Sequence, residues 1–278
     1  MADGLVREQV GHLKELPALE PMSGPELRDG FLAQARPAFF PGKVCDWPAL
    51  ERWTWEALPE LMPGQRIILS EVNGAECDRW KVSISDFSAY CNSDGTKGLA
   101  SAPSGLPWYA VNFSPFREDL PPGGDWEMPD LISCRLGSLG HDRNWFLDRF
   151  GWLFMGPSGT RTLPHTDLFA THAWLAQIRG EKQIIIYDPA EIQRAIAEKC
   201  MMDFAWTVTL RPGDFLVIPG GVYHEATSLS PSMTLSFNFV DETNWDNFRA
   251  AIVADAQRWS TITRGVAISC NEELNHHD

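Results

Sequence analysis

A histidine and an aspartate stand two positions apart in the stretch "LPHTDLFATHAWLAQIRGEKQIIIYDP", which covers residues 163–189. On an extended strand His165 and Asp167 would point to the same side, because alternate side chains share one face. An imidazole nitrogen and a carboxylate oxygen held in this way can bind one metal ion. Such a pair alone is also typical of a surface or capping pair, so a metal site needs a third ligand from elsewhere in the chain.

The best candidate for the third ligand is His224, which lies in "RPGDFLVIPGGVYHEA". An apolar run at residues 215–218 ends in a Pro-Gly-Gly turn, and His224 follows near the start of another extended segment. A histidine after such a turn at the mouth of a barrel can reach across to a facing strand. Two histidines and one aspartate form the facial triad that suits Fe(II) and leaves coordination positions open. The same ligands fit Zn(II) or Mn(II), so the residue types do not identify the metal.

Lys182 follows Gly180-Glu181 and begins the apolar run "QIIIYD". An amine that enters a barrel among apolar side chains needs an anionic partner, because an unpaired buried charge is costly. A dicarboxylate bound to the metal would supply that partner through its far carboxylate. A solvent-facing lysine in a turn is the alternative.

Short strands separated by turns must position these residues. From residue 145 onward the strand-like runs are "WFLDRFGWLFMG", "TRTLPHTD", "AWLAQIRG", "EKQIIIYD", "TVTL", "DFLVI" and "MTLSFNFV". In the last run apolar and polar residues alternate, so that Leu235, Phe237 and Phe239 face away from Asn238. Many short β runs with glycine and proline turns predict a sandwich or barrel.

Helices are expected on both sides of these strands. Asp188-Pro189 is a suitable cap and first-turn pair, and it predicts a helix over residues 190–202. Residues 36–61 are typical of a short strand, a turn and a tryptophan-rich helical stretch. Residues 102–130 are rich in proline and glycine, which predicts loops around one short strand.

The last helical stretch, residues 242–265, carries an apolar stripe. Trp245, Phe248, Ile252 and Trp259 lie on roughly one side of it. The stripe suits packing on the domain, and its two tryptophans would also suit a homodimer contact. The sequence leaves both alternatives open.

The composition bounds the class of protein. The 278 residues are 44% hydrophobic, which allows one large domain or two small ones. The net charge of −14 would repel a phosphate backbone, so we expect no nucleic-acid partner; it is compatible with simple solubility or with a basic peptide or amine substrate. The six cysteines form no CxxC motif, and charges, prolines or glycines interrupt every apolar run. The polar start lacks the apolar region of a signal peptide, so we expect a soluble, cytoplasmic protein without a membrane partner.

Four segments carry a resemblance to a known family: "TLPHTD", "AQIRGEKQIIIYDP", "RPGDFLVIPGGVYHEA" and "TLSFNF". In this order and spacing they resemble the JmjC-type, cupin-like Fe(II)- and 2-oxoglutarate-dependent oxygenases, closest to the small protein and peptide hydroxylases of that group. The resemblance covers roughly residues 30–245 and implies a mainly β fold, a double-stranded β-helix (cupin or jelly-roll) core with flanking helices. It divides the chain into an N-terminal extension (1–30), the oxygenase domain (31–242) and a C-terminal helix and tail (243–278).

This resemblance also implies an iron site and a co-substrate site. Fe(II) would be held by His165, Asp167 and His224, and 2-oxoglutarate would chelate it through its 2-oxo group and one carboxylate. The other carboxylate would meet Lys182, the lysine of the family's GxK segment. Three more residues match family positions around the co-substrate: Tyr109 and Thr162, which would hydrogen-bond this far carboxylate, and Asn238, near the metal-bound end.

Thr162 departs from the pattern of a regular strand. It stands three positions before His165, so the two side chains would point to opposite faces. Pro164 lies between them and would correct this by breaking the strand.

The interval between His165 and Lys182 is a second departure. It is 17 residues, longer by a short insertion than in the hydroxylases that the chain resembles. The stretch "LFATHAW" must absorb the insertion, and either Thr171 or His172 would then line the site. We expect His172 to be a loop or supporting histidine rather than a replacement ligand.

The expected function follows from the resemblance. With Fe(II), 2-oxoglutarate and O₂, the protein would hydroxylate an amino-acid side chain in a peptide or protein. A free amino acid or a natural-product intermediate is the second choice of substrate, and demethylation of an N-methyl group by the same chemistry is the third. Candidates to wall the pocket are Trp108, Trp145, Trp152 and Trp206.

Two other classes of protein stay open. A non-catalytic, metal-binding cupin would keep the metal without turnover, and a Zn- or Mn-dependent cupin isomerase or hydrolase would need no 2-oxoglutarate. Lys182 with Tyr109 favours the oxygenase, because neither alternative needs an anchor for a dicarboxylate at this interval from the histidine-aspartate pair.

Overall fold

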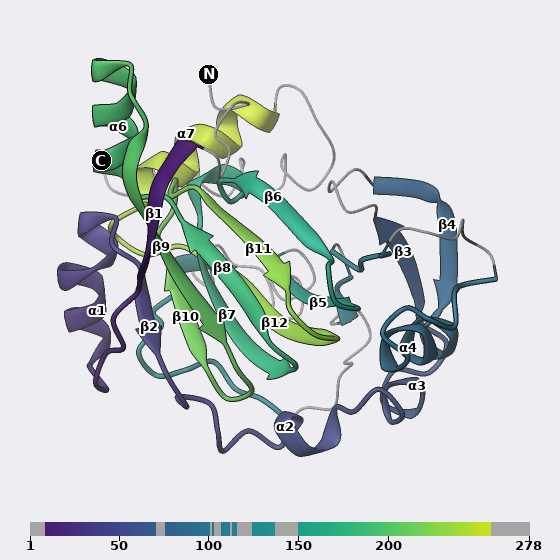
Figure 1. Cartoon of the computed structure of the whole chain (residues 1–278). Coiled ribbons are helices and arrows are strands. Elements are labelled where there is room, and N and C mark those ends of the chain that lie inside the picture. The colour runs from purple at the N-terminus through teal and green to yellow at the C-terminus, as the bar shows by residue number, and fades with distance from the viewer. Residues whose placement is uncertain are drawn as a thin grey trace.

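The computed structural model describes residues 9–70, 76–100, 102, 107–111, 113–115, 124–136 and 150–256. Most of the described strands belong to two five-stranded sheets (Figure 1). The first sheet has the order β1 (Val10–Glu15), β9 (Met202–Leu210), β8 (Lys182–Ile186), β11 (His224–Ser228) and β6 (Arg161–His165). The second has the order β2 (Ala38–Phe40), β10 (Phe215–Ile218), β7 (His172–Arg179), β12 (Ser232–Phe239) and β5 (Gly151–Gly156).

An apolar core lies between the two sheets. Leu175 on β7 and Leu216 on β10 belong to the same buried cluster as Ile184 on β8 and Val208 on β9. The strand pairs within the sheets are antiparallel, except that β1 runs parallel to β9. This arrangement of two facing sheets is a double-stranded β-helix, so the predicted mainly β class is confirmed.

The N-terminal half of the chain packs against the second sheet. Trp174 and Phe237 point away from the core between the sheets and join a second apolar cluster with Trp53, Leu58 and Phe87. The elements on this side are α1 (Gly24–Gly30), the 3-10 helix η2 (Leu32–Gln34), α2 (Ala49–Arg52), α3 (Leu58–Leu61), the antiparallel pair β3 (Arg66–Ser70) and β4 (Glu76–Ser83), and α4 (Ile84–Asn92). The strand and helical stretch predicted for residues 36–61 are therefore present as β2, α2 and α3.

The helix predicted after Asp188 is α6 (Pro189–Glu198), and it is shorter than expected. The Asp188 side chain accepts hydrogen bonds from the backbone of Ala190 and Glu191, as the cap prediction requires. The helix ends where Lys199 adopts a left-handed conformation (φ 54°). The extension to residue 202 is wrong, because Met202 is buried at the start of β9.

The loop-rich region at 102–130 is also more irregular than predicted. In its described part the expected short strand is reduced to two isolated bridges, between Ser70 and Tyr109 and between Ala110 and Met155. Through Tyr109 and Ala110 these bridges connect Ser70 on β3 with Met155 on β5. Tyr109 is therefore fixed by hydrogen bonds without belonging to a strand.

One end of the described chain joins the first sheet, and the other packs in an apolar cluster beside β5 and β12. The strand β1 comes from the predicted N-terminal extension, yet it extends the first sheet. In the C-terminal helix α7 (Trp245–Ala256), the residues Trp245, Phe248 and Ile252 are buried together with Val240. These three residues of the stripe thus pack within the protein, as the first alternative predicted. Trp259 lies outside the described residues. A homodimer contact and the division of the chain at residues 30 and 242 stay predictions.

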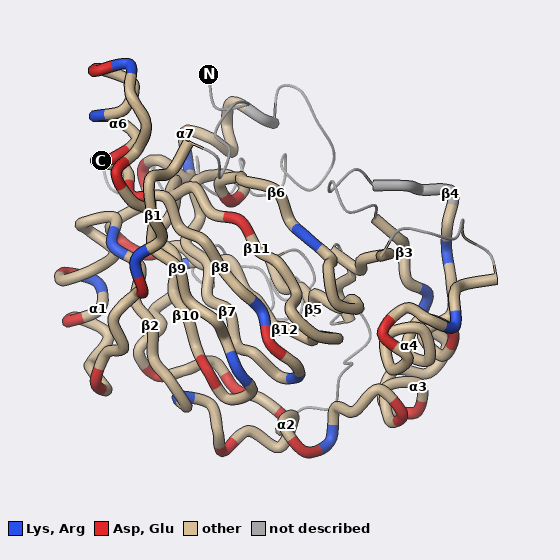
Figure 2. Tube along the Cα trace, in the orientation of Figure 1, with Lys and Arg blue, Asp and Glu red and all other residues tan. Residues whose placement is uncertain are grey.

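Charged residues are distributed over many elements. Acidic and basic residues are interspersed along the helices and connecting loops of the described trace (Figure 2). Among the described helices, none is both long enough and apolar enough to cross a membrane.

Candidate metal centre

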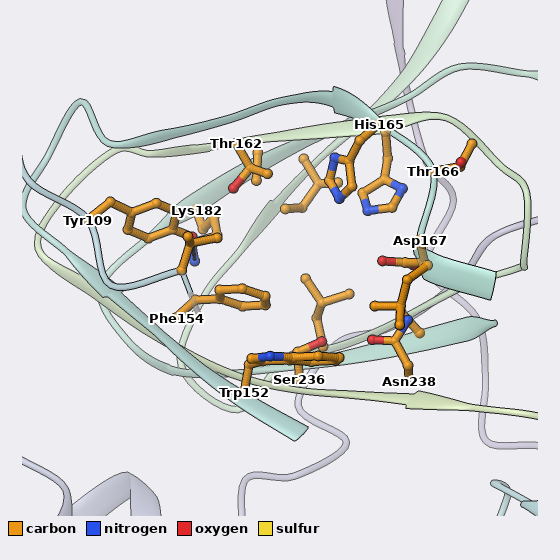
Figure 3. Close-up of a pocket in the computed structure, with 17 residues that line it drawn as sticks. Tyr109, Trp152, Phe154, Thr162, His165, Thr166, Asp167, Lys182, Ser236 and Asn238 are labelled. Atoms are coloured by element: carbon orange, nitrogen blue, oxygen red, sulfur yellow. Dashed lines mark hydrogen bonds between the residues drawn. The ribbon is translucent and has the colours of Figure 1, made fainter. Parts of the chain in front are cut away.

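A cavity of about 340 Å³ opens between the two sheets where β5, β6, β11 and β12 approach one another. It is lined by Tyr109, Val111, Trp152, Phe154, Thr162, His165, Thr166, Asp167, Leu168, Ala173, Leu175, Lys182, Ile184, His224, Ala226, Ser236 and Asn238. All seven residues that the sequence singled out for the site are among them. Figure 3 shows Tyr109 and Lys182 at one end of the cavity and His165 and Asp167 at the other.

Three side chains with metal-binding atoms meet at the second end. One ligand atom from each of His165, Asp167 and His224 lies within 4.8 Å of the others. The two histidines are direct neighbours across β6 and β11, with ring centroids 4.3 Å apart. Asp167 follows the end of β6 with extended backbone (φ −63°, ψ 153°), so it keeps the orientation expected two residues after His165.

Backbone carbonyls orient both imidazole rings. His165 Nδ1 lies 2.8 Å from the carbonyl of Leu163, and His224 Nδ1 lies 3.0 Å from the carbonyl of Val222. A carbonyl oxygen only accepts, so each Nδ1 carries the proton and each Nε2 keeps its lone pair for a metal. Burial lowers the pKa of His224, which favours the neutral, ligating form, although Asp167 acts in the opposite direction.

The carboxylate of Asp167 supplies a direct test of whether a metal fits. Its Oδ2 atom is buried and has no hydrogen-bond partner in the described structure. A buried acceptor without a partner is costly, and such groups are rare in folded proteins. A cation held between this oxygen and the two Nε2 atoms would remove that cost. The residues therefore fit a divalent ion such as Fe(II), Mn(II) or Zn(II).

The other end of the cavity contains a buried cation. Lys182 is 1% exposed, and its Nζ atom lies 3.5 Å from the Tyr109 hydroxyl. Among the described residues it forms no ion pair, and its Nζ faces the rings of Tyr109 and Phe154 at 5.7 and 5.6 Å. Burial lowers the pKa of Lys182 to about 7. A carboxylate of a ligand at this place would compensate the buried charge.

Tyr109 and Thr162 extend this polar end. Burial raises the pKa of Tyr109, and a hydrogen bond with Thr162 acts in the opposite direction. Together with Lys182 they present two hydroxyl groups and one amine to the same part of the cavity. Such a set of donors suits an anion.

A β-bulge brings Thr162 to this place. On β11, His224 and Ala226 are two residues apart, but their partners on β6, His165 and Thr162, are three residues apart. The additional residue lies at Leu163–Pro164 and restores Thr162 to the face of His165. The irregularity expected around Pro164 is thus present as a bulge.

Asn238 lines the cavity from the second sheet, and its amide donates to Thr171 Oγ1 at 2.7 Å. Neither Thr171 nor His172 is part of the lining. The His172 ring is buried on the other side, with Nε2 at 3.0 Å from Thr243 Oγ1. His172 is therefore not grouped with the three candidate ligands.

One of the four tryptophans that were expected to wall the cavity does line it. Trp152 lines the cavity, whereas Trp108 is buried in the N-terminal apolar cluster and Trp206 packs at the edge of the core between the sheets. Trp145 lies outside the described residues. Phe154, which was not among the predicted site residues, lines the cavity two residues after Trp152 on β5. Strand periodicity would have indicated it, because both residues share one face.

Comparison with known proteins agrees with this geometry. Residues 147–248 match a family model, that of the JmjC domain. This part of the chain is thus similar in sequence to the JmjC domain. The matched residues include β5 to β12 and all the cavity residues named above except Tyr109 and Val111.

The curated relatives of this chain are distant in sequence. The 2-oxoglutarate and iron-dependent oxygenase JMJD4 of Danio rerio is 24% identical over 123 residues, which are 36% of this chain and 29% of the relative. Arginine-specific demethylase JMJ20 of Arabidopsis thaliana is 23% identical over 278 aligned residues, covering 82% of this chain and 59% of the relative. Jumonji C domain-containing protein 5 of Drosophila melanogaster is 23% identical over 251 residues, covering 80% and 59%. The chain thus spans less than two thirds of the length of each of these three relatives.

Proposed function

We propose that this protein is an Fe(II)- and 2-oxoglutarate-dependent oxygenase that hydroxylates an amino-acid side chain in a peptide or protein. One observation carries the proposal: a His-Asp-His cluster and a buried lysine without an ion-pair partner among the described residues share one cavity. A metal site alone would leave Lys182 unexplained. A ligand that chelates the metal and carries a second carboxylate explains both ends.

The residues have separate tasks in this proposal. His165, Asp167 and His224 would hold the iron through two imidazole nitrogens and one carboxylate oxygen. Lys182, Tyr109 and Thr162 would bind the far carboxylate of 2-oxoglutarate, and Asn238 would lie near its metal-bound end. When bound, iron, 2-oxoglutarate and O₂ together supply the conversion of a C–H bond to C–OH, with succinate and CO₂ as co-products. The apolar walls formed by Trp152, Phe154 and the neighbouring strands exclude water from this space.

The lining supports an uncharged target side chain. Among the described lining residues Asp167 is the only carboxylate, and in this proposal it is a metal ligand. Leu168 lies at the cavity and is 39% exposed, and Leu163 on the adjacent β6 is equally exposed. Exposed apolar side chains beside a site suit contact with a larger partner such as a peptide or protein.

Demethylation is the second candidate. It is favoured by the names of two relatives in Arabidopsis thaliana, an arginine-specific and a lysine-specific demethylase. A methylated lysine or arginine would bring a positive charge into a cavity in which the described residues hold no second carboxylate. Hydroxylation is therefore the first choice.

An anaerobic titration tests the proposal. Fe(II) and then 2-oxoglutarate are added to the purified protein, and the weak visible metal-to-ligand charge-transfer band is recorded. We expect the band in the wild type, its loss in His224→Ala, and a much higher 2-oxoglutarate requirement in Lys182→Met. Lys43→Met serves as a matched control, because Lys43 is exposed and remote in the fold from the cavity lining.

The outcomes separate the classes of protein. Metal binding without the band would overturn the oxygenase and favour a cupin that binds metal without 2-oxoglutarate. If the band forms, a panel of synthetic peptides is incubated aerobically and analysed by mass spectrometry. A mass gain of one oxygen atom indicates hydroxylation, whereas loss of a methyl group with release of formaldehyde indicates demethylation.

A further inference from the structure

Two of the candidate metal ligands are presented by irregular segments. Asp167 begins the 3-10 helix η5 (Leu168–Ala170), in which Phe169 and Ala170 both have left-handed backbone with φ of 52° and 54°. His224 follows the Pro-Gly-Gly turn at residues 219–221. Left-handed conformations of residues other than glycine cost energy and persist only where the surrounding structure holds them.

A side chain near the start of α7 holds the Asp167 segment. Asn244 donates from Nδ2 to the carbonyl of Ala170 at 2.9 Å, and its Oδ1 accepts from the backbone of Asp241 at 3.0 Å. Phe169 packs against the apolar cluster of α7. The left-handed segment is therefore fixed to Asn244 by one hydrogen bond and to the apolar cluster of α7 by the packing of Phe169.

His172 holds the turn before His224. The backbone N–H of Gly220 donates to His172 Nδ1 at 2.8 Å. Nδ1 is thus the acceptor, and Nε2–H points to Thr243 Oγ1 and Asp241 Oδ1 at 3.0 and 3.3 Å. His172 and Asp241 are both about 2% exposed, so this network is buried.

The two segments also touch each other. A Cβ atom on Gly220 would lie 2.2 Å from the carbonyl oxygen of Ala170 and 3.1 Å from that of Thr171. Only glycine permits this approach of the two backbones. The backbones of the two segments are therefore in direct contact.

We propose that His172 and Asn244 are positioning residues that set the geometry of Asp167 and His224 through residues 241–244. This inference rests on the proposed metal site. It assigns a role to the inserted stretch between His165 and Lys182 and to the segment joining β12 to α7. Neither positioning residue touches the metal ligands; each acts on the backbone that carries one of them.

Two amide substitutions of His172 separate positioning from simple packing. In His172→Asn, Oδ1 takes the place of Nδ1 and can still accept from Gly220 N–H. In His172→Gln, the amide reaches toward Thr243 and Asp241 but no acceptor remains at the Nδ1 position. We expect the Kd for Mn(II) to rise about tenfold in His172→Gln, which loses the contact with Gly220. We expect a smaller rise in His172→Asn, which keeps that contact but loses those with Thr243 and Asp241. His12→Gln, at an exposed histidine, is the matched control.

Asn244→Asp tests the other half of the network and decides the matter if His172→Gln does not fold. The carboxylate can still accept from Asp241 N–H but cannot donate to the Ala170 carbonyl. We expect faster amide hydrogen exchange in residues 167–171 of the metal-free protein and an increase of about tenfold in the Mn(II) Kd.

The measurements distinguish failure of this inference from failure of the metal site. Calorimetric titration with Mn(II) well below the unfolding temperature gives the Kd of folded protein, and thermal unfolding gives the stability without metal. If the wild type binds Mn(II) and both His172→Gln and Asn244→Asp bind it equally well, the positioning role is wrong and the metal site stands. If the wild type does not bind Mn(II), the metal site and the inference that rests on it are both overturned.

Discussion

Two histidine-aspartate groups lie in the same domain, and their polar atoms have different surroundings. In the pair His172–Asp241, both ring nitrogens and the carboxylate have protein partners. In the group of His165, Asp167 and His224, the two Nδ1 atoms have carbonyl partners, whereas Asp167 Oδ2 is buried without one. Residue type is the same in both. Incomplete hydrogen bonding, rather than the presence of histidine and aspartate, therefore distinguishes the group that fits a metal.

Exchange of one carboxylate for an amide in each group gives the largest expected effect. Asp167→Asn should weaken Mn(II) binding by at least about 100-fold, since it removes a ligand, and should leave the stability of the metal-free protein nearly unchanged. Asp241→Asn should weaken metal binding less, but should destabilise the metal-free protein by about 1–3 kcal/mol because it disturbs a satisfied buried network. Calorimetric titration and urea unfolding measure the two effects. Equal losses of stability in the two variants would contradict the comparison.

Lys182→Met extends the comparison to the buried amine at the other end of the cavity, which has no ion-pair partner among the described residues. The pKa of Lys182 is lowered from 10.5 to about 7 by burial, so the folded protein binds fewer protons than the unfolded chain between these values. Lys182 therefore destabilises the metal-free protein most below pH 7, and the destabilisation declines as the pH rises toward 10.5. We expect Lys182→Met to be more stable than wild type by about 3 kcal/mol near pH 8, with the difference falling by about 1.4 kcal/mol per pH unit above pH 7.

Urea unfolding over this pH range measures the difference, and Lys43→Met should show none. A difference between Lys182→Met and wild type that does not change with pH would mean that Lys182 is not desolvated as the structure indicates. The same variant should lose affinity for 2-oxoglutarate, so the gain in stability and the loss of binding come from one side chain.

Metal addition should stabilise the wild type through the group of His165, Asp167 and His224, and not through the His172–Asp241 pair. Mn(II) at about 100 times its Kd should raise the free energy of unfolding by about 2.7 kcal/mol. Asp167→Asn should show no such increase at the same concentration, whereas Asp241→Asn should still respond. Thermal unfolding with and without Mn(II) is the measurement, and an equal response of wild type and Asp167→Asn would indicate binding elsewhere on the protein.

Thr162→Val should give the smallest effect. The hydroxyl would contribute one hydrogen bond to the far carboxylate of 2-oxoglutarate, at the Lys182 end of the cavity. The binding free energy of 2-oxoglutarate should therefore weaken by about 0.5–1.5 kcal/mol, at most about tenfold in Kd. The Mn(II) affinity should not change, because Thr162 lies at the opposite end of the cavity from Asp167. A loss of Mn(II) affinity would instead mean that the bulge at Leu163–Pro164 requires the threonine.

Much of the fold could be predicted because strand alternation is a local signal. The run that forms β12 alternates as predicted, with Phe237 in the N-terminal apolar cluster and Asn238 at the cavity. The end of α6 could not be predicted in this way, since Met202 is apolar and suits a helix as well as a strand. Met202 belongs to β9, where it pairs with Val10, almost two hundred residues away in the chain.

The candidate site could likewise be predicted only where the signal lies within a short stretch of sequence. The positions of His165, Asp167 and Lys182 follow from spacing within one short stretch, and a resemblance added Tyr109 and Asn238. The environment of His172 has no local signal, because its partners Asp241 and Thr243 come about seventy residues later.

The bulge on β6 has a consequence for contacts between molecules. Among the described strands β6 is at the end of its sheet, and a regular outer strand offers its unpaired amides to any other extended chain. Pro164 removes one amide hydrogen from this edge, and the additional residue interrupts the spacing of the others. The irregularity that turns Thr162 inward thus also makes β6 a less regular template for pairing with another extended chain.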